Sequence, residues 1–169
     1  MKIWQTRITL VALLALFSEN NSSGQTTPIY DIPQLAHIAI DGQPDDWGQR
    51  GFRVDALAGA DGRIDDPADI HARFRLGWDD RGLLILATIA DDEIKESQWE
   101  SWLVAGDCVQ FFLANPQPGY QAARFDVAPG LDPDYPQLRS YIFPYNGSGA
   151  LKIEAQSSKT PNGYILEAL

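Results

Sequence analysis

The sequence predicts an all-β fold: an antiparallel β-sandwich of the immunoglobulin-like or jelly-roll type with little helix. Several short runs alternate apolar and polar residues with period two, as strands with one buried face do. Gly, Pro and Asp separate these runs at close spacing, which favours turns between many strands. No stretch keeps a helical period over more than about two turns.

The clearest hairpin is predicted at residues 72–90. In the run ARFRLGWD (72–79), Phe74, Leu76 and Trp78 share one side, so we expect Trp78 to lie in the core. An Asp- and Gly-containing turn follows at 79–82. The run LLILATIA (83–90) is apolar on both sides and is therefore predicted to be a central strand.

Further strands are predicted later in the chain, at residues 107–113, 123–127 and 139–145, with a second hairpin formed by 150–156 and 163–169. Cys108 is the only cysteine, so no internal disulfide can form, and we expect it to be a small buried apolar residue. The last strand stops at Leu169 without a turn, which predicts that the sequence is a fragment lacking its C-terminal strands.

The N-terminus has the layout of a secretory signal peptide. A short basic segment with Lys2 and Arg7 precedes an apolar run, 8–18, that is too short to span a bilayer, and small polar residues follow it. Cleavage is predicted after Ser18 or Gly24. We therefore expect a signal peptide at 1–24, a linker at 25–36, a domain at 37–169, and a secreted or periplasmic protein without membrane insertion after cleavage.

The charge balance restricts the class of ligand. The formal net charge is −10, and removal of residues 1–24 makes it −11 because two bases and one acid are lost. Phosphate-rich partners demand a basic surface, so nucleic acid and anionic membranes are not expected. A neutral ligand or a cation suits this composition better.

Catalytic signatures are absent, and we expect the chain to be non-catalytic. It has no P-loop, nucleophile elbow, HExxH or CxxC motif, and its two histidines lie far apart in sequence. Four Asp-Asp pairs begin at Asp45, Asp65, Asp79 and Asp91. They fit turn residues that bond their own backbone, while Ca²⁺ ligands in loops are the alternative.

The tryptophans fall into different environments. Trp47 is expected to pin the N-terminal strand to the sandwich. Trp99 and Trp102 lie in a polar connection, ESQWESW, between two predicted strands. Their spacing fits one helical turn packed on a sheet, or an aromatic surface at the rim of a ligand site, where indole stacks on the C–H face of a sugar.

An ordered set of motifs resembles the family 9 carbohydrate-binding modules. These are IAIDGQPDDWGQ (38–49), ARFRLGWDDRGLLILATIADDEI (72–94), WLVAGDCVQFFL (102–113) and GYILEAL (163–169), which together span most of residues 38–169. The resemblance implies an exported, non-catalytic β-sandwich that binds a polysaccharide or oligosaccharide. Such a module accompanies a glycoside hydrolase or another polysaccharide-processing protein, and Ca²⁺ supports its fold.

The resemblance also implies site residues. Trp102 matches one half of a tryptophan clamp around the sugar, and Trp99 is a second candidate for that position. The sugar-bonding glutamate of the motif is Gln110 here, a departure that keeps hydrogen-bonding ability but loses the charge. Arg124 matches a sugar-contacting arginine. The second clamping tryptophan is expected beyond Leu169.

Two other functions are alternatives. One is an accessory or interaction domain without sugar affinity, in which Trp102 would be buried against the sheet. The other is a haem-binding sandwich, which would need axial ligands. After signal cleavage the chain has no methionine and only His37 and His71, which disfavours haem.

Overall fold

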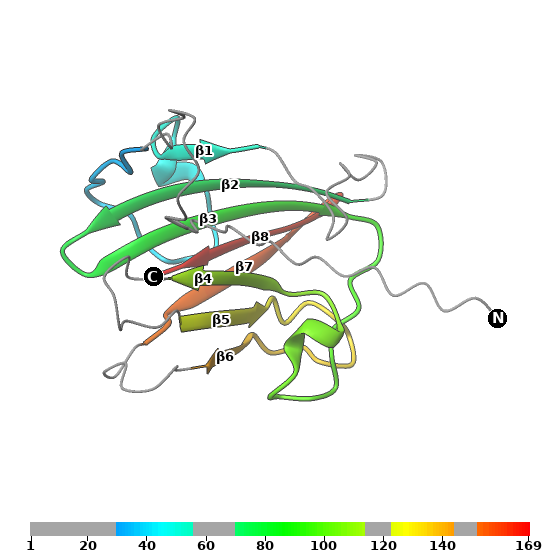
Figure 1. Cartoon of the computed structure of the whole chain (residues 1–169). Coiled ribbons are helices and arrows are strands. Elements are labelled where there is room, and N and C mark those ends of the chain that lie inside the picture. The colour runs from blue at the N-terminus through cyan, green and yellow to red at the C-terminus, as the bar shows by residue number, and fades with distance from the viewer. Residues whose placement is uncertain (1–29, 56–69, 114–122, 144–151) are drawn as a thin grey trace, which may run out of the picture.

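The computed structural model describes residues 30–55, 70–113, 123–143 and 152–169, which form two antiparallel sheets (Figure 1). One sheet has the order β1 (Phe52–Val54), β2 (Ile70–Asp79), β3 (Gly82–Asp91), β8 (Gly163–Ala168) and β7 (Ala155–Thr160). The other has the order β4 (Val109–Leu113), β5 (Ala123–Ala128) and β6 (Arg139–Phe143). Two 3₁₀ turns, η1 (Asp45–Trp47) and η2 (Leu103–Ala105), are the only helical elements in these ranges. The fold is all-β, as predicted.

The main core lies between the two sheets. Side chains of the five-stranded sheet, such as Phe74, Ile89 and Leu166, pack in one cluster with Phe111 and Phe125 of the three-stranded sheet. On β2 and β5 the inward residues alternate with polar ones, so there the period-two pattern of the sequence produces this layer directly. The structure is therefore a β-sandwich.

The prediction of a central strand at 83–90 is confirmed by β3. Its odd-numbered residues face the main core, and Leu84 and Leu86 form a second apolar cluster on the opposite side of the sheet. The N-terminal segment covers that side with Leu35, Ile38 and Trp47. A strand that is buried on both faces loses its apolar–polar alternation, as this one does.

A buried carboxylate fastens the N-terminal segment to the sheet. Glu167 of β8 is fully buried and accepts hydrogen bonds from the backbone N–H groups of Asp41 and Gly42, at 3.0 and 2.8 Å, and from Trp47 Nε1 at 2.7 Å. Gly42 has φ of +78°, a conformation that glycine adopts without strain. Trp47 therefore pins the N-terminal segment, as predicted.

Two predictions about individual positions are wrong. Trp78 is 43% exposed and not in the core: it lies at the end of β2 beside the turn at 79–82, and it is not part of the cluster between the sheets that includes Phe74 and Leu76 of this strand. Its indole N–H donates to the carbonyl of Ile32. The strand expected at 150–156 is β7 at Ala155–Thr160, whose mainly polar composition gives little strand signal.

The remaining sequence predictions have mixed outcomes. Cys108 is a buried free cysteine, as expected. The strands predicted at 107–113, 123–127 and 139–145 correspond to β4, β5 and β6, with Val109 starting β4. The predicted signal peptide, residues 25–29 of the linker, and the pair Asp65–Asp66 lie outside the described residues. Within the ranges described above, no helix is both long and apolar enough to cross a membrane.

Replacing Glu167 with alanine tests the role of this carboxylate. The change leaves three buried donors without an acceptor, so we expect the free energy of unfolding to fall by about 3 kcal/mol. Urea denaturation followed by circular dichroism measures this loss. The exposed Glu154 provides the control, since Glu154→Ala should change stability by less than about 0.5 kcal/mol. Equal effects of the two substitutions would contradict the fastening role.

Candidate functional site

The connection between β3 and β4 contains a closed loop, residues 95–107, which we call the tryptophan loop. Its two ends meet in a pair of hydrogen bonds. The backbone N–H of Lys95 donates to Asp107 Oδ2 at 2.6 Å, and the Asp107 N–H donates to the Lys95 carbonyl at 2.7 Å. Gly106 lies so close to this neck that an added Cβ would come within 2.6 Å of the Lys95 oxygen. The neck therefore requires a glycine and holds the loop closed.

A buried glutamate anchors the tryptophan loop to the segment between β5 and β6. Glu96 accepts hydrogen bonds from the backbone of Leu131 at 2.7 Å and from Arg139 Nη2 at 3.1 Å. In return, the Glu96 N–H donates to Asp132 Oδ2 at 2.9 Å. A charged group that is paired and hydrogen-bonded in this way holds its surroundings in one arrangement. The start of the loop is thus tied to the three-stranded sheet.

The tip of the loop presents two tryptophans to solvent. Leu103, which directly follows Trp102, is fully buried and clusters with Cys108 and Ala128, with Tyr141 packed against them. Trp99 and Trp102 are 55% and 49% exposed, and the Trp102 N–H donates to the Trp99 carbonyl in a turn. The spacing of these tryptophans reflects a turn, and neither indole is buried against a sheet.

The outer side of the three-stranded sheet continues this surface. Strand register places Gln110 beside Asp126 and Asp126 beside Tyr141, and the neighbouring row holds Arg124 beside Phe143. We call Gln110, Asp126 and Tyr141 the polar row. Leu103 packs in the same cluster as Tyr141, so the tryptophan loop borders the polar row.

Asp126 links two of the residues predicted from the sequence. Its carboxylate is completely buried, accepts a hydrogen bond from Gln110 Nε2 at 2.8 Å and lies 3.1 Å from Arg124 Nη2. The Arg124 guanidinium also lies over the ring of Phe143, 3.5 Å from its centroid. Asp126 and Phe143 therefore fix the position of Arg124, while Arg124 Nε and Nη2 have no hydrogen-bond partner among the described residues.

The structure separates the four predicted site residues into two groups. Trp99 and Trp102 are exposed on the loop, and Arg124 keeps 17% of its side chain exposed at the edge of the polar row. Gln110 is only 4% exposed, so its position suits support of Asp126 better than direct ligand contact.

Sequence reasoning missed Asp126, Tyr141 and the anchor Glu96. The two-residue spacing of Arg124 and Asp126 on one strand was the available signal for Asp126.

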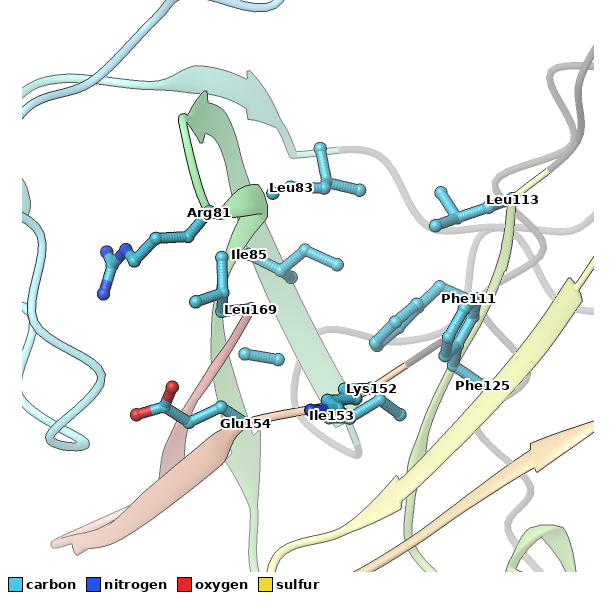
Figure 2. A pocket seen from close by; sticks show the side chains of 12 residues that line it. Arg81, Leu83, Ile85, Phe111, Leu113, Phe125, Lys152, Ile153, Glu154 and Leu169 are labelled. Atoms are coloured by element: carbon cyan, nitrogen blue, oxygen red, sulfur yellow. The ribbon is translucent and has the colours of Figure 1, made fainter. Parts of the chain in front are cut away.

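A cavity of about 560 Å³ lies elsewhere, between the sheets (Figure 2). Its lining is mainly apolar and includes Ile85, Phe111 and Phe125, while the charged ends of Arg81 and Glu154 point away from these side chains. Recognition of a sugar needs several polar groups that converge on its hydroxyls. The described residues that line the cavity do not form such a group, so we place the candidate site on the tryptophan loop and the polar row.

The three Asp-Asp pairs that the structure describes each have a carboxylate that accepts a hydrogen bond from a backbone N–H. Asp79 Oδ1 accepts from the Arg81 N–H, Asp91 Oδ1 from the Glu93 N–H, and Asp46 Oδ2 from the Ala39 N–H. For Asp79 and Asp91 this agrees with the turn interpretation. In the part of the chain that the structure describes, no group of three or more His, Cys, Asp or Glu side chains is placed to hold a metal ion.

Comparisons of the chain with family models, with curated proteins and with solved structures find no match. The arguments about function therefore depend on the geometry of the site itself.

The carboxyl group of Asp107, at the neck of the tryptophan loop, has a raised pKa because it is buried. Loss of solvent raises the pKa of Asp107 from 3.8 to about 7, and the nearby charges of Asp91, Glu96 and Asp132 add to this effect. The hydrogen bond from Lys95 opposes it. Because the folded-state pKa is raised, ionisation of Asp107 destabilises the fold increasingly as the pH rises from about 4 to about 7.

Asp107→Asn is therefore expected to stabilise the protein at high pH. The amide keeps an acceptor for the Lys95 N–H but cannot ionise, so the variant should exceed the native protein by up to about 4 kcal/mol at pH 8 and match it near pH 4. Thermal unfolding across this pH range measures the difference. The exposed Asp92→Asn is the control, and a stability gain that does not depend on pH would contradict the assignment.

Gln110→Glu tests the contact between Gln110 and Asp126. A glutamate at this position would put a second carboxylate beside a fully buried one, and we expect a loss of about 3 kcal/mol at pH 7 that diminishes in acid. The exchange Gln110→Glu with Asp126→Asn keeps one amide and one carboxylate, so it should recover most of the stability. Chemical denaturation of the native protein and the two variants measures this. A double variant no more stable than Gln110→Glu would disprove the coupling.

Proposed function

We propose that this chain is a non-catalytic carbohydrate-binding module that stacks a sugar ring on an exposed tryptophan. The observation that carries the proposal is the pair Trp99 and Trp102, both about half exposed at the tip of a loop that is fastened at its neck and base. Large aromatic side chains are normally buried in a soluble domain, so two exposed indoles on a fixed loop favour a contact surface.

The chemistry next to the loop suits a sugar. An indole ring packs against the apolar C–H face of a pyranose, and hydroxyls at the edge of the sugar need donors and acceptors. Arg124 is held by Asp126 and Phe143 and is partly exposed, so it can donate to a hydroxyl without losing its own partner. Because Asp126 neutralises Arg124, the polar row favours a neutral ligand over a strongly charged one.

Gln110 has an indirect role in this proposal. Its amide N–H₂ donates to Asp126 and the residue is buried, so it orients the carboxylate that holds Arg124. The departure from the glutamate of the family motif then follows from electrostatics, because two adjacent buried carboxylates would repel each other. The site keeps its arginine and changes the way in which the arginine is supported.

The alternative of an accessory domain without sugar affinity expects Trp102 to be buried against the sheet. Trp102 is instead about half exposed, which favours the sugar-binding proposal. A proposed partner is a polysaccharide or oligosaccharide outside the cytoplasm, on a protein that processes such polymers. The proposal gives the chain no catalytic residue and assigns no step of hydrolysis to it.

Titration with neutral oligosaccharides of glucose and xylose tests the function. We expect saturable quenching or enhancement of tryptophan fluorescence, and at least about tenfold weaker binding for Trp102→Ala, as the loss of a stacking contact implies. Trp78→Ala is the matched control, because Trp78 is exposed to a similar degree but lies on β2 away from the loop. Isothermal titration calorimetry gives the affinities of all three proteins.

Binding that is unchanged in Trp102→Ala, or equally weakened in Trp78→Ala, would contradict the proposed site. Absence of saturable binding to any neutral oligosaccharide in the panel would contradict the function.

A further inference from the structure

The outer side of the five-stranded sheet carries a compact group of arginines, Arg53, Arg73 and Arg75, which we call the arginine face. Arg53 of β1 is the direct register partner of Arg75 of β2. Arg73 and Arg75 are two residues apart on β2, with Phe74 between them pointing into the core. The three side chains therefore share the outer side of the sheet, about 5 Å apart between strands and about 7 Å apart along β2. Arg53 and Arg73 are exposed there, whereas Arg75 is half-buried at the edge of the N-terminal segment that covers part of this side.

None of these arginines has a carboxylate partner among the described residues. Arg53 donates to Gln49 Oε1, Arg73 donates to His71 Nε2 at 3.0 Å, and Arg75 donates to the carbonyl of Gly48. None of these acceptors is a carboxylate, so none of them supplies a negative charge to offset a guanidinium. Each also keeps unused N–H donors, because a guanidinium has five.

This arrangement costs stability and is unusual for the composition. Like charges placed directly opposite on neighbouring strands destabilise a sheet, and Arg53 and Arg75 are such a pair. The chain as a whole has a net charge of −10, so acidic residues are plentiful, yet none neutralises this face among the described residues. An anionic partner would remove the repulsion and satisfy the free donors.

We propose that the arginine face binds an acidic polysaccharide, one whose sugar rings carry carboxylate groups. The three arginines start from backbone positions about 5 and about 7 Å apart, comparable to the length of one sugar ring, and Arg forms paired hydrogen bonds with carboxylates. The exposed Thr88, the register partner of Arg73, adds a hydroxyl for the uncharged part of a ring. Because the protein itself has a net negative charge, it would be repelled by duplex DNA or an anionic bilayer, whose negative charges are more densely spaced than those of an acidic polysaccharide.

The arginine face is distinct from the tryptophan loop. Arg73 and Arg75 lie on the outer side of the five-stranded sheet, whereas the polar row lies on the outer side of the three-stranded sheet, and the core separates them. Loss of one surface should therefore leave the other intact. A chain with both surfaces could contact a neutral and an acidic polymer at once.

Binding of polygalacturonate tests the proposal. We expect the full chain to bind this polymer at low ionic strength, with an affinity that falls as salt is added. The double variant Arg53→Gln/Arg73→Gln should bind at least about tenfold more weakly. The control Lys152→Gln/Lys159→Gln removes the same charge from two exposed lysines elsewhere and should bind within about twofold of the native protein. Matching circular dichroism and melting temperatures show that the variants are folded.

Several results would overturn the proposal: no binding at low salt, an equal loss in the lysine control, or tighter binding to duplex DNA or to phosphatidylglycerol vesicles than to polygalacturonate. Trp102→Ala separates the two surfaces. It should keep native affinity for polygalacturonate, and a loss in this variant would place the polymer on the tryptophan loop instead.

Discussion

The candidate site depends on the closure of the tryptophan loop by Lys95 and Asp107. Two hydrogen bonds, each donated by a backbone N–H, join residues twelve positions apart, and Gly106 permits the close approach that they need. Without this neck, the loop would lose conformational entropy each time it bound a ligand, and this loss would weaken the affinity. With it, Trp99 and Trp102 are already held at the surface, and the binding energy of stacking is available for affinity.

Buried carboxylates also hold other segments of the sandwich in place. Glu167 holds the N-terminal segment on one side, Glu96 holds the tryptophan loop on the other, and Asp126 holds the arginine of the polar row. Each lies in a place where removal of its partners would be costly, since an uncompensated buried charge destabilises a fold strongly. The acidic composition of the chain is thus partly structural, and it leaves the arginine face as a positively charged exception.

The sequence predicts most of the fold because strand periodicity is a local property. Phe74 and Phe125 alternate with polar residues, and both point into the core. Prediction fails at the end of a strand: Trp78 continues the pattern of Phe74, but it lies beside the turn that follows β2, is 43% exposed and bonds to the N-terminal segment through Ile32. The site was predicted less completely. The tryptophans are visible in their polar context, whereas Asp126 and Glu96 look like ordinary surface acids, and only the register and the loop path bury them.

The most direct test of the account is the response of the indole N–H resonances to a neutral oligosaccharide in ¹H–¹⁵N spectra of the native chain. The account predicts that the Trp102 resonance shifts, with a smaller shift at Trp99, while the resonances of Trp47, which is bonded to Glu167, and of Trp78 stay in place. Saturable shifts at Trp78 or Trp47 with none at Trp102 or Trp99 would contradict it.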